Sequence, residues 1–165
     1  MPGMRVLLVL GSLAAGIAAL PGSASRAQDA AAQAFLQSVY APYQVSDKAI
    51  DIGSQQKATR WFVPSLAKLI GQDVAQSKKR NEVGRLDFDP FIGGQDWSPT
   101  RIDLKVAAGA APDRATGTAR FTPPGEKKES VVTLDLARTP AGWRIADMHW
   151  AGVADSLVAI LSKKE

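Results

Sequence analysis

Apolar side chains recur at helical spacing in the segment that follows residue 28. Asp29 is of a type that caps the start of a helix, and Pro42 disfavours the helical conformation in the residue before it. One helix is therefore predicted over residues 29–41. Its buried face would consist of Phe35, Leu36, Val39 and Tyr40.

A second apolar run predicts two more helices, which join near Val63. Ser54 precedes the first of them, and Pro64 suits the first position of the second because the N–H that proline lacks has no helical partner there. The stretch 72–81 has only Val74 as a large apolar residue, so a frayed helix end or a loop is expected there. The apolar positions of the two helices are Ala58, Trp61, Phe62, Leu66, Leu69 and Ile70.

From residue 99 onward the pattern changes to an alternation of apolar and polar residues, which predicts strands. The short links between these strands favour antiparallel neighbours. Because the helices come first, the sequence predicts an α+β fold, in which N-terminal helices pack on a curved antiparallel sheet of about four strands and a short C-terminal helix follows. The strands are expected at residues 99–106, 115–121, 129–138 and 143–150, and the last helix carries Val153, Leu157, Ile160 and Leu161.

The first 27 residues are typical of an export signal. Arg5 precedes an apolar run at residues 6–20, Pro21 and Gly22 interrupt that run, and small residues continue to Ala27. The run of about fifteen residues is shorter than the roughly twenty that a membrane span needs. An uncleaved membrane anchor is the alternative interpretation.

Cleavage of this leader is expected after Ala27, with cleavage after Ala24 as the alternative. Residues 1–27 would then be a signal peptide and residues 28–165 a single domain with no membrane span. The periplasm is the expected destination, although secretion is also compatible with a leader. Because the chain has no cysteine, neither a disulfide nor a lipid-anchored terminus is expected.

Composition and charge narrow the class of partner. Apolar residues at 45% and charged residues at 22% are typical of a folded globular domain. The formal net charge of +4 falls by two when Arg5 and Arg26 leave with the leader. The adjacent basic residues are scattered, so no nucleic-acid partner is expected. They are Lys78-Lys79-Arg80, Lys127-Lys128 and Lys163-Lys164.

Two stretches carry a resemblance to a known family. Residues 62–69, Phe-Val-Pro-Ser-Leu-Ala-Lys-Leu, and residues 87–97, Asp-Phe-Asp-Pro-Phe-Ile-Gly-Gly-Gln-Asp-Trp, resemble a family of exported bacterial proteins catalogued as a domain of unknown function. The order of elements, with residues 142–148 as a late strand, resembles the nuclear transport factor two-like, or cystatin-like, cone fold. The resemblance covers most of residues 30–161. It implies a small cone with a pocket between the concave face of the sheet and the helices.

The densest polar cluster combines Asp87, Asp89, Gln95 and Asp96 with the ring of Trp97. Neighbouring carboxylates among apolar rings can acquire the raised pKa that acid–base chemistry uses. Aspartates before proline and after glycine also occur in turns, where the carboxylate accepts backbone N–H groups. The turn role is the preferred interpretation, and ligand lining and catalysis are the alternatives.

His149 is the only histidine and lies two residues after Asp147, so a regular strand would place both on one face as a candidate acid–base dyad. Met148 and Trp150 are the apolar residues here, which means that the inward positions shift by one after Ile145. A β-bulge that sends Asp147 or His149 outward is therefore expected. A satisfied or exposed histidine is preferred to a pocket residue or a catalytic base.

The sequence favours neither a cofactor nor a metal. One histidine and no cysteine cannot supply the usual zinc ligands, and residues 87–98 lack the glycine and the final glutamate of a calcium loop. Nucleophile-elbow and phosphate-binding glycine motifs are also missing from the sequence. The four tryptophans are expected to fill the core rather than to floor an aromatic pocket: Trp61, Trp97, Trp143 and Trp150.

These features predict an exported, non-catalytic module that binds a small molecule or an envelope protein. One alternative is a cone-fold hydrolase or isomerase that uses Asp89 or Asp96 with His149, and another, implied by the resemblance, is a periplasmic immunity or inhibitor protein. A homodimer stays open, but the expected polar sheet face argues against a large apolar interface there. That face should expose Arg101, Asp103, Lys105, Thr133 and Asp135. The candidate ligand-binding residues are Asp87, Asp89, Gln95, Asp96, Trp97 and His149.

Overall fold

Helices precede strands in the computed structural model, which describes residues 21–163 and their side chains from residue 28 onward. This order, with N-terminal helices packed on an open four-stranded antiparallel sheet and a short C-terminal helix, confirms the predicted α+β class. The elements are α1 (Pro21–Val45), α2 (Gln55–Ala58), α3 (Pro64–Arg80), β1 (Asp103–Ala108), β2 (Arg114–Phe121), β3 (Ser130–Thr139), β4 (Gly142–Trp150) and α4 (Leu157–Ser162).

The sheet follows the chain in the order β1-β2-β3-β4, with every neighbouring pair antiparallel. Its register shifts within β3–β4, where Asp135 pairs with Asp147 but Leu136 pairs with Ile145. The extra residue is Ala146, and it produces the bulge expected from the sequence. The shift lets both Ile145 and Met148 point into the core, where each is fully buried.

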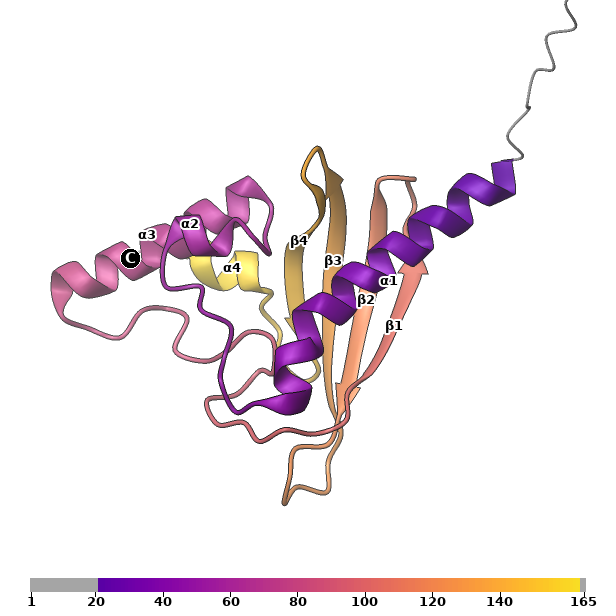
Figure 1. Cartoon of the computed structure of the whole chain (residues 1–165). Coiled ribbons are helices and arrows are strands. Elements are labelled where there is room, and N and C mark those ends of the chain that lie inside the picture. Colours follow the sequence, from indigo (N-terminus) through magenta and orange to yellow (C-terminus); the bar gives the residue numbers. More distant parts are fainter. Residues whose placement is uncertain (1–20, 164–165) are drawn as a thin grey trace, which may run out of the picture.

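Helix α1 crosses one face of the sheet, whereas α2, α3 and α4 lie beside β4 (Figure 1). Leu36 of α1 packs over Gly117 of β2, where an added Cβ would come within 3.2 Å of the leucine side chain. The glycine therefore allows the helix to approach the sheet closely. The core fills the space between them and includes Val39, Leu134 and Leu136.

The outer edge of β4 is bridged at Ile145 by the link between α2 and α3. Val63 N donates to Ile145 O at 2.9 Å, and Ile145 N donates to Trp61 O at 2.8 Å. These bonds form a short parallel bridge between Phe62 and Ile145. Among the described strands, β1 is the edge strand at the other side of the sheet.

Helix α1 is longer than the predicted 29–41 at both ends. At its start, the helix already includes residues 21–28, so Asp29 lies inside it and does not cap it. At its end, Pro42 lies inside the helix, and Ser46 N still donates to Pro42 O at 2.9 Å. The buried Tyr40 and Tyr43 hold this last turn in the core, and this packing outweighs the one hydrogen bond that proline forfeits.

Helix α3 continues through residues 72–80, so of the two alternatives expected there, a frayed helix end or a loop, the loop is wrong. Its turns are anchored by Asp73, which is 6% exposed and accepts backbone N–H groups from the segment that follows the helix. The helix ends at Arg80, and Asn81 after it has a φ of 56°, the left-handed conformation common just beyond helix ends.

The predicted leader mostly lies outside the described residues, which begin at residue 21. The expected cleavage site after Ala27 falls within α1. Among the described helices, none combines the length and the apolar character that crossing a membrane requires.

Candidate functional site

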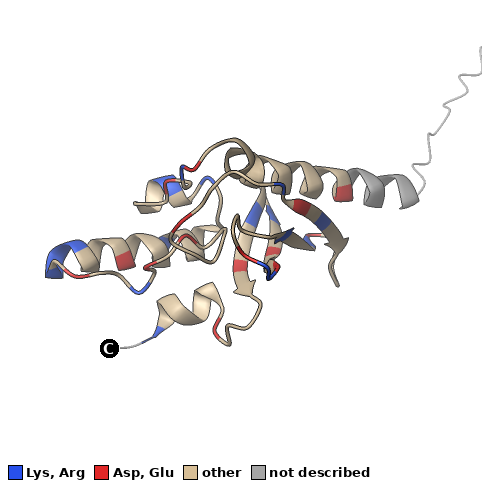
Figure 2. Ribbon diagram, turned by 90° about the horizontal axis from the view of Figure 1, so that it is seen from below, with Lys and Arg blue, Asp and Glu red and all other residues tan. Residues whose placement is uncertain are grey.

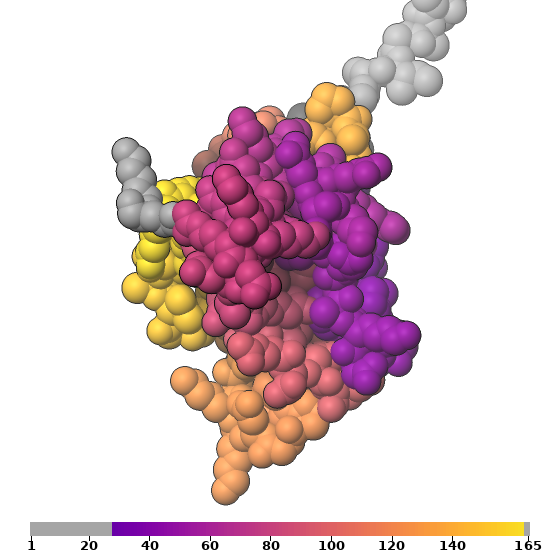
Figure 3. Space-filling view, turned by 90° about the vertical axis from the view of Figure 1, so that its left-hand side faces the viewer, coloured from indigo at the N-terminus to yellow at the C-terminus, as the bar shows by residue number. Residues whose placement is uncertain are grey.

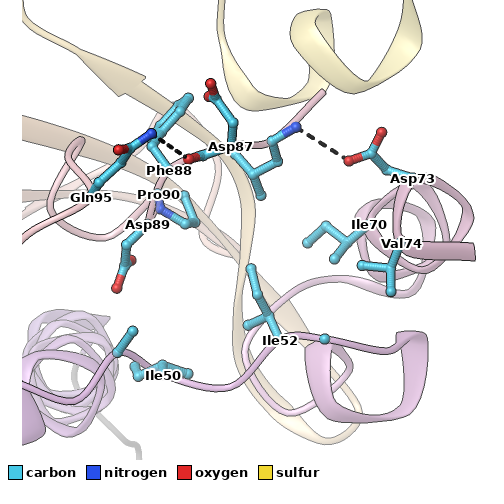
Figure 4. Close-up of a pocket in the computed structure, with 13 residues that line it drawn as sticks. Ile50, Ile52, Ile70, Asp73, Val74, Asp87, Phe88, Asp89, Pro90 and Gln95 are labelled. Atoms are coloured by element: carbon cyan, nitrogen blue, oxygen red, sulfur yellow. Dashed lines mark hydrogen bonds between the residues drawn. The ribbon is translucent and has the colours of Figure 1, made fainter. Parts of the chain in front are cut away.

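A cavity of about 520 Å³ lies between the segment 49–53, α3 and the loop 86–95. Figure 3 views this side of the molecule, where α3 and the loop after it lie between α4 and the N-terminal segments. Three of the predicted site residues line the cavity, namely Asp87, Asp89 and Gln95 (Figure 4). Its apolar wall is formed by Ile50, Ile52, Ile70, Val74, Leu86 and Pro90.

Aromatic side chains hold the loop 86–95 against the core. The Trp150 indole donates to Pro90 O at 2.8 Å, and the buried Tyr40 hydroxyl donates to Phe91 O at 3.0 Å. Gly93 turns the chain with a φ of 66°, and a Cβ there would lie 2.8 Å from the Trp150 ring. The glycine therefore serves both the turn and the close contact.

Asp89 ties this loop to the end of α1. Its Oδ1 accepts from Phe91 N at 2.9 Å, as the turn interpretation predicts, and its Oδ2 accepts from the Tyr43 hydroxyl at 2.6 Å. The same hydroxyl accepts from Ile50 N at 3.1 Å, so one carboxylate organises two walls of the cavity. Burial raises the pKa of Asp89, and the two hydrogen bonds oppose that shift. Burial and the neighbouring Asp89 charge raise the pKa of Tyr43.

Asp87 and Gln95 form the exposed side of the cavity. The Gln95 amide donates to Asp87 O at 3.1 Å. The Asp87 carboxylate itself is exposed, and within residues 28–163 no side chain or backbone group bonds to it. Of the two predicted carboxylates that line the cavity, the one on Asp89 is hydrogen-bonded within the fold and the one on Asp87 is not.

Asp96 and Trp97 do not line this cavity. The Trp97 indole donates to Tyr43 O at 2.7 Å, and its ring meets those of Tyr43 and Phe121 edge to face. Trp97 thus joins the loop to the core, in agreement with its expected packing role. Asp96 is exposed.

His149 lies on the opposite face of the sheet from the cavity. Its neighbour Trp150 points inward to Pro90, so alternation along β4 sends His149 outward. There His149 Nε2 lies 3.1 Å from Asp135 Oδ2, and the two side chains are 46% and 51% exposed. The expectation of an outward histidine after a bulge is confirmed.

Asp147 completes a polar group with Asp135 and His149. Asp147 Oδ1 accepts from Met148 N at 2.8 Å and from Val158 N at 2.9 Å, which fixes the carboxylate against α4. One ligand-type atom from each of the three side chains lies within 4.8 Å of the others, a spacing that a divalent ion could bridge. The sequence did not suggest this set, because Asp135 comes from a different strand.

Asp73 is a cavity residue that sequence reasoning missed. Its Oδ1 accepts from Arg85 N at 2.9 Å, its Oδ2 accepts from Leu86 N at 3.2 Å, and Arg85 Nη1 lies 3.5 Å from Oδ1. Figure 4 shows how Asp73 reaches from α3 to the start of the loop. The sequence did contain a signal for this residue. Leu66, Ile70 and Asp73 follow helical spacing, so Asp73 falls on the buried face of the helix, where an aspartate needs a hydrogen-bond partner.

A second cavity, of about 830 Å³, shares Ala49 and Ile50 with the first. Its charged lining is mainly basic. Lys57 pairs with Asp51 and lowers the pKa of that carboxyl, chiefly through the hydrogen bond between them. Elsewhere on the surface the charges are mixed along the strands, and basic residues gather at the end of α3 (Figure 2). The basic lining residues are Lys48, Lys57 and Arg60, with the Arg60 guanidinium 5.0 Å from the centre of the Trp61 ring.

Comparison with known proteins identified no relative of this chain. No family model matches the chain, and neither a curated protein nor a solved structure matches it significantly. The candidate site is therefore defined by its own geometry.

Proposed function

We propose that this chain is an exported, non-catalytic module that binds a small ligand in the cavity between the segment 49–53, α3 and the loop 86–95. The observation that carries the proposal is the cavity itself, whose volume of about 520 Å³ is within the range of small-molecule sites. Export to the periplasm is supported by the sequence of the leader, in which Arg5 precedes an apolar run and small residues continue to Ala27.

The wall of the cavity has the composition of a ligand site. Aliphatic side chains from three separate segments face it, represented by Ile50, Ile70 and Leu86, and a few polar groups lie beside them. Such a wall favours an apolar ligand body, and the polar groups would orient it. The loop that carries the polar groups is fixed by Trp150, Tyr40 and Tyr43, so the site is formed without a ligand.

The acid–base alternative has less support. Both carboxylate oxygens of Asp89 already accept hydrogen bonds, and His149 pairs with Asp135 on the other face of the sheet. The titratable side chains among the described cavity residues are all aspartates, so the cavity offers no histidine, lysine or tyrosine as a proton-transfer partner.

Native mass spectrometry tests the proposal on the full chain, expressed with its leader and purified gently from the cell envelope. We expect a retained small-molecule adduct. Val74→Trp should abolish it by filling the cavity, whereas Ala75→Trp, on the same helix but exposed, should retain it. A heteromeric mass with no small adduct would instead favour the envelope-protein or immunity role.

A fragment screen by amide NMR provides the second measurement. Fragments that bind should shift the amides of Ile50, Val74 and Leu86 in the wild type and in Ala75→Trp, but not in folded Val74→Trp. If no adduct is retained and no fragment shifts these amides, the proposal is wrong.

A further inference from the structure

The polar side chains of the 520 Å³ cavity are almost entirely hydrogen-bond acceptors. The described lining contains no lysine, arginine, histidine or hydroxyl side chain. Its one side-chain donor, the Gln95 amide, already donates to Asp87 O. A ligand inside this cavity therefore meets carboxylate and amide oxygens, and it must supply the donors itself. The polar lining consists of Asp73, Asp87, Asp89 and Gln95.

These acceptors differ in how fully the fold uses them. Asp73 receives two backbone N–H groups and an ion pair from Arg85, so its charge is balanced within the protein. Asp89 receives one hydrogen bond on each oxygen, whereas an ionised carboxylate has about four acceptor positions. Neither Asp87 nor Asp89 has a cationic partner among the described residues. Two carboxylates of the lining, on Asp87 and Asp89, thus have no cationic side chain opposite them within the described residues.

The directions of these carboxylates indicate which one a ligand would contact. In Figure 4 the Asp89 carboxylate points toward the part of the wall that carries Ile50, whereas the Asp87 carboxylate points away from it. An apolar ligand body against Ile50, Ile52 and Val74 would therefore place its polar end near Asp89. Asp87 would act at longer range, through the electrostatic field at the rim.

The neighbouring 830 Å³ cavity has the opposite character. Three cations, Lys48, Lys57 and Arg60, line it against a single acid, Asp51. The two cavities meet at Ala49 and Ile50, so the segment 49–50 separates an acidic site from a basic one. This segregation gives an internal control, because an anionic probe should prefer the second cavity.

We propose that the ligand of the first cavity is a cationic amphiphile, an apolar body that carries an ammonium or guanidinium group directed at Asp89. This assignment rests on the proposed ligand-binding function and adds the chemical class. The aliphatic wall receives the body, and Asp89 receives the charged N–H donors in a site partly screened from water, where a charge-assisted hydrogen bond is stronger than on the surface.

Three probes of matched shape test the assignment on the protein purified from the full chain at pH 7. They are benzylamine, a cation, benzyl alcohol, a neutral molecule, and benzoate, an anion. Amide NMR titrations give the affinity and the location of each. We expect benzylamine to shift the amides of Ile50, Val74 and Leu86 and to bind roughly tenfold more tightly than benzyl alcohol. Benzoate should shift Lys57, Arg60 and Trp61 instead.

Variants separate the two carboxylates. Asp89→Asn should remove most of the preference for benzylamine, and Asp87→Asn, at an exposed position, should reduce it less. Asp135→Asn, on the outer face of the sheet and outside the cavity lining, is the control and should leave benzylamine binding unchanged. The wild-type ratio of benzylamine to benzyl alcohol does not depend on whether Asp89→Asn folds.

The outcomes distinguish this assignment from the function on which it rests. Equal affinity for benzylamine and benzyl alcohol at the first cavity overturns the cationic class and leaves the ligand-binding function standing. Benzylamine shifts confined to the exposed Asp135 and His149 region overturn the class as well. If no probe shifts the cavity amides, both proposals fail.

Discussion

Asp89 and Asp135 are both aspartates that bond to a side chain from another element, but they lie in opposite regions of the molecule. Asp89 is half-buried in the loop 86–95 and accepts from Tyr43 and Phe91. Asp135 lies on the outer face of the sheet and bonds to His149, with both side chains about half exposed. The polar contact in the loop holds a cavity wall in place, whereas the contact on the outer face is open to water and screened by it. Burial, rather than residue type, decides what each aspartate does.

The largest expected difference between the two regions is in the free energy of unfolding. It comes from Phe91, the apolar residue that holds the loop 86–95 in the core. Phe91 is fully buried and packs against the rings of Tyr43 and Phe62. Phe91→Ala should lower the free energy of unfolding by about 3–5 kcal/mol, measured by urea denaturation, because a large core side chain is lost and a void is left.

His149→Ala is the matched substitution on the outer face. It should change the free energy of unfolding by about 0.5 kcal/mol or less, because the His149 side chain is about half exposed. Similar losses from the two substitutions would contradict the contrast between the regions.

An intermediate effect on the free energy of unfolding is expected when the buried carboxylate of Asp73 is removed, in comparison with the exposed carboxylate of Asp135. Asp73→Ala leaves the N–H groups of Arg85 and Leu86 without their acceptor, and it should cost about 2–3 kcal/mol in the free energy of unfolding. Asp135→Ala should cost less than about 1 kcal/mol. Chemical denaturation of both variants checks the order, and amide exchange should show faster opening at Leu86 only in Asp73→Ala.

The smallest effect is a pH dependence carried by Asp89. Because the folded pKa lies above the ordinary value of 3.8, the folded state keeps the proton in a window where the unfolded state has released it. As the pH rises through that window, the wild type should lose stability relative to Asp89→Asn, and the difference should level off above it.

Urea denaturation of both proteins at a series of pH values measures this difference. If the wild type instead gains stability relative to the variant as the pH rises, the pKa of Asp89 is lowered in the folded state. The hydrogen bonds from Tyr43 and Phe91 would then outweigh burial.

The sheet could be predicted from the sequence more fully than the helices could. Alternation of residues such as Leu104 and Val106 with Asp103 and Lys105 depends on local geometry, so the strands and the bulge before Met148 follow from the pattern. The ends of α1 and α3 depend instead on tertiary contacts of Tyr43 and Asp73, which local rules do not contain. For this reason the sequence pattern ended the first helix too early, before Pro42, and left residues 72–81 open between a frayed helix end and a loop.

The candidate site was predicted in part. Asp87, Asp89 and Gln95 attracted attention through their local density of polar groups, and the structure brings them together at one cavity. The opposite wall comes from residues 49–53, a segment with no periodic pattern, and from α3 far along the chain. Which side chains face one another across a cavity is a property of the folded arrangement, so neither Ile50 nor Asp73 could be assigned to the site from spacing alone.

The bridge between the link 61–63 and β4 has a consequence for self-association. Exposed strand edges can recruit the edge of another chain, and a sheet with two open edges can extend into a filament. Here Trp61 and Val63 hydrogen-bond to Ile145 and occupy part of one edge, which leaves β1, among the described strands, as the edge without a further neighbour. If two chains paired through their β1 strands, each chain would use its one available edge, and the pair would have none left. Growth would therefore stop at two chains instead of propagating.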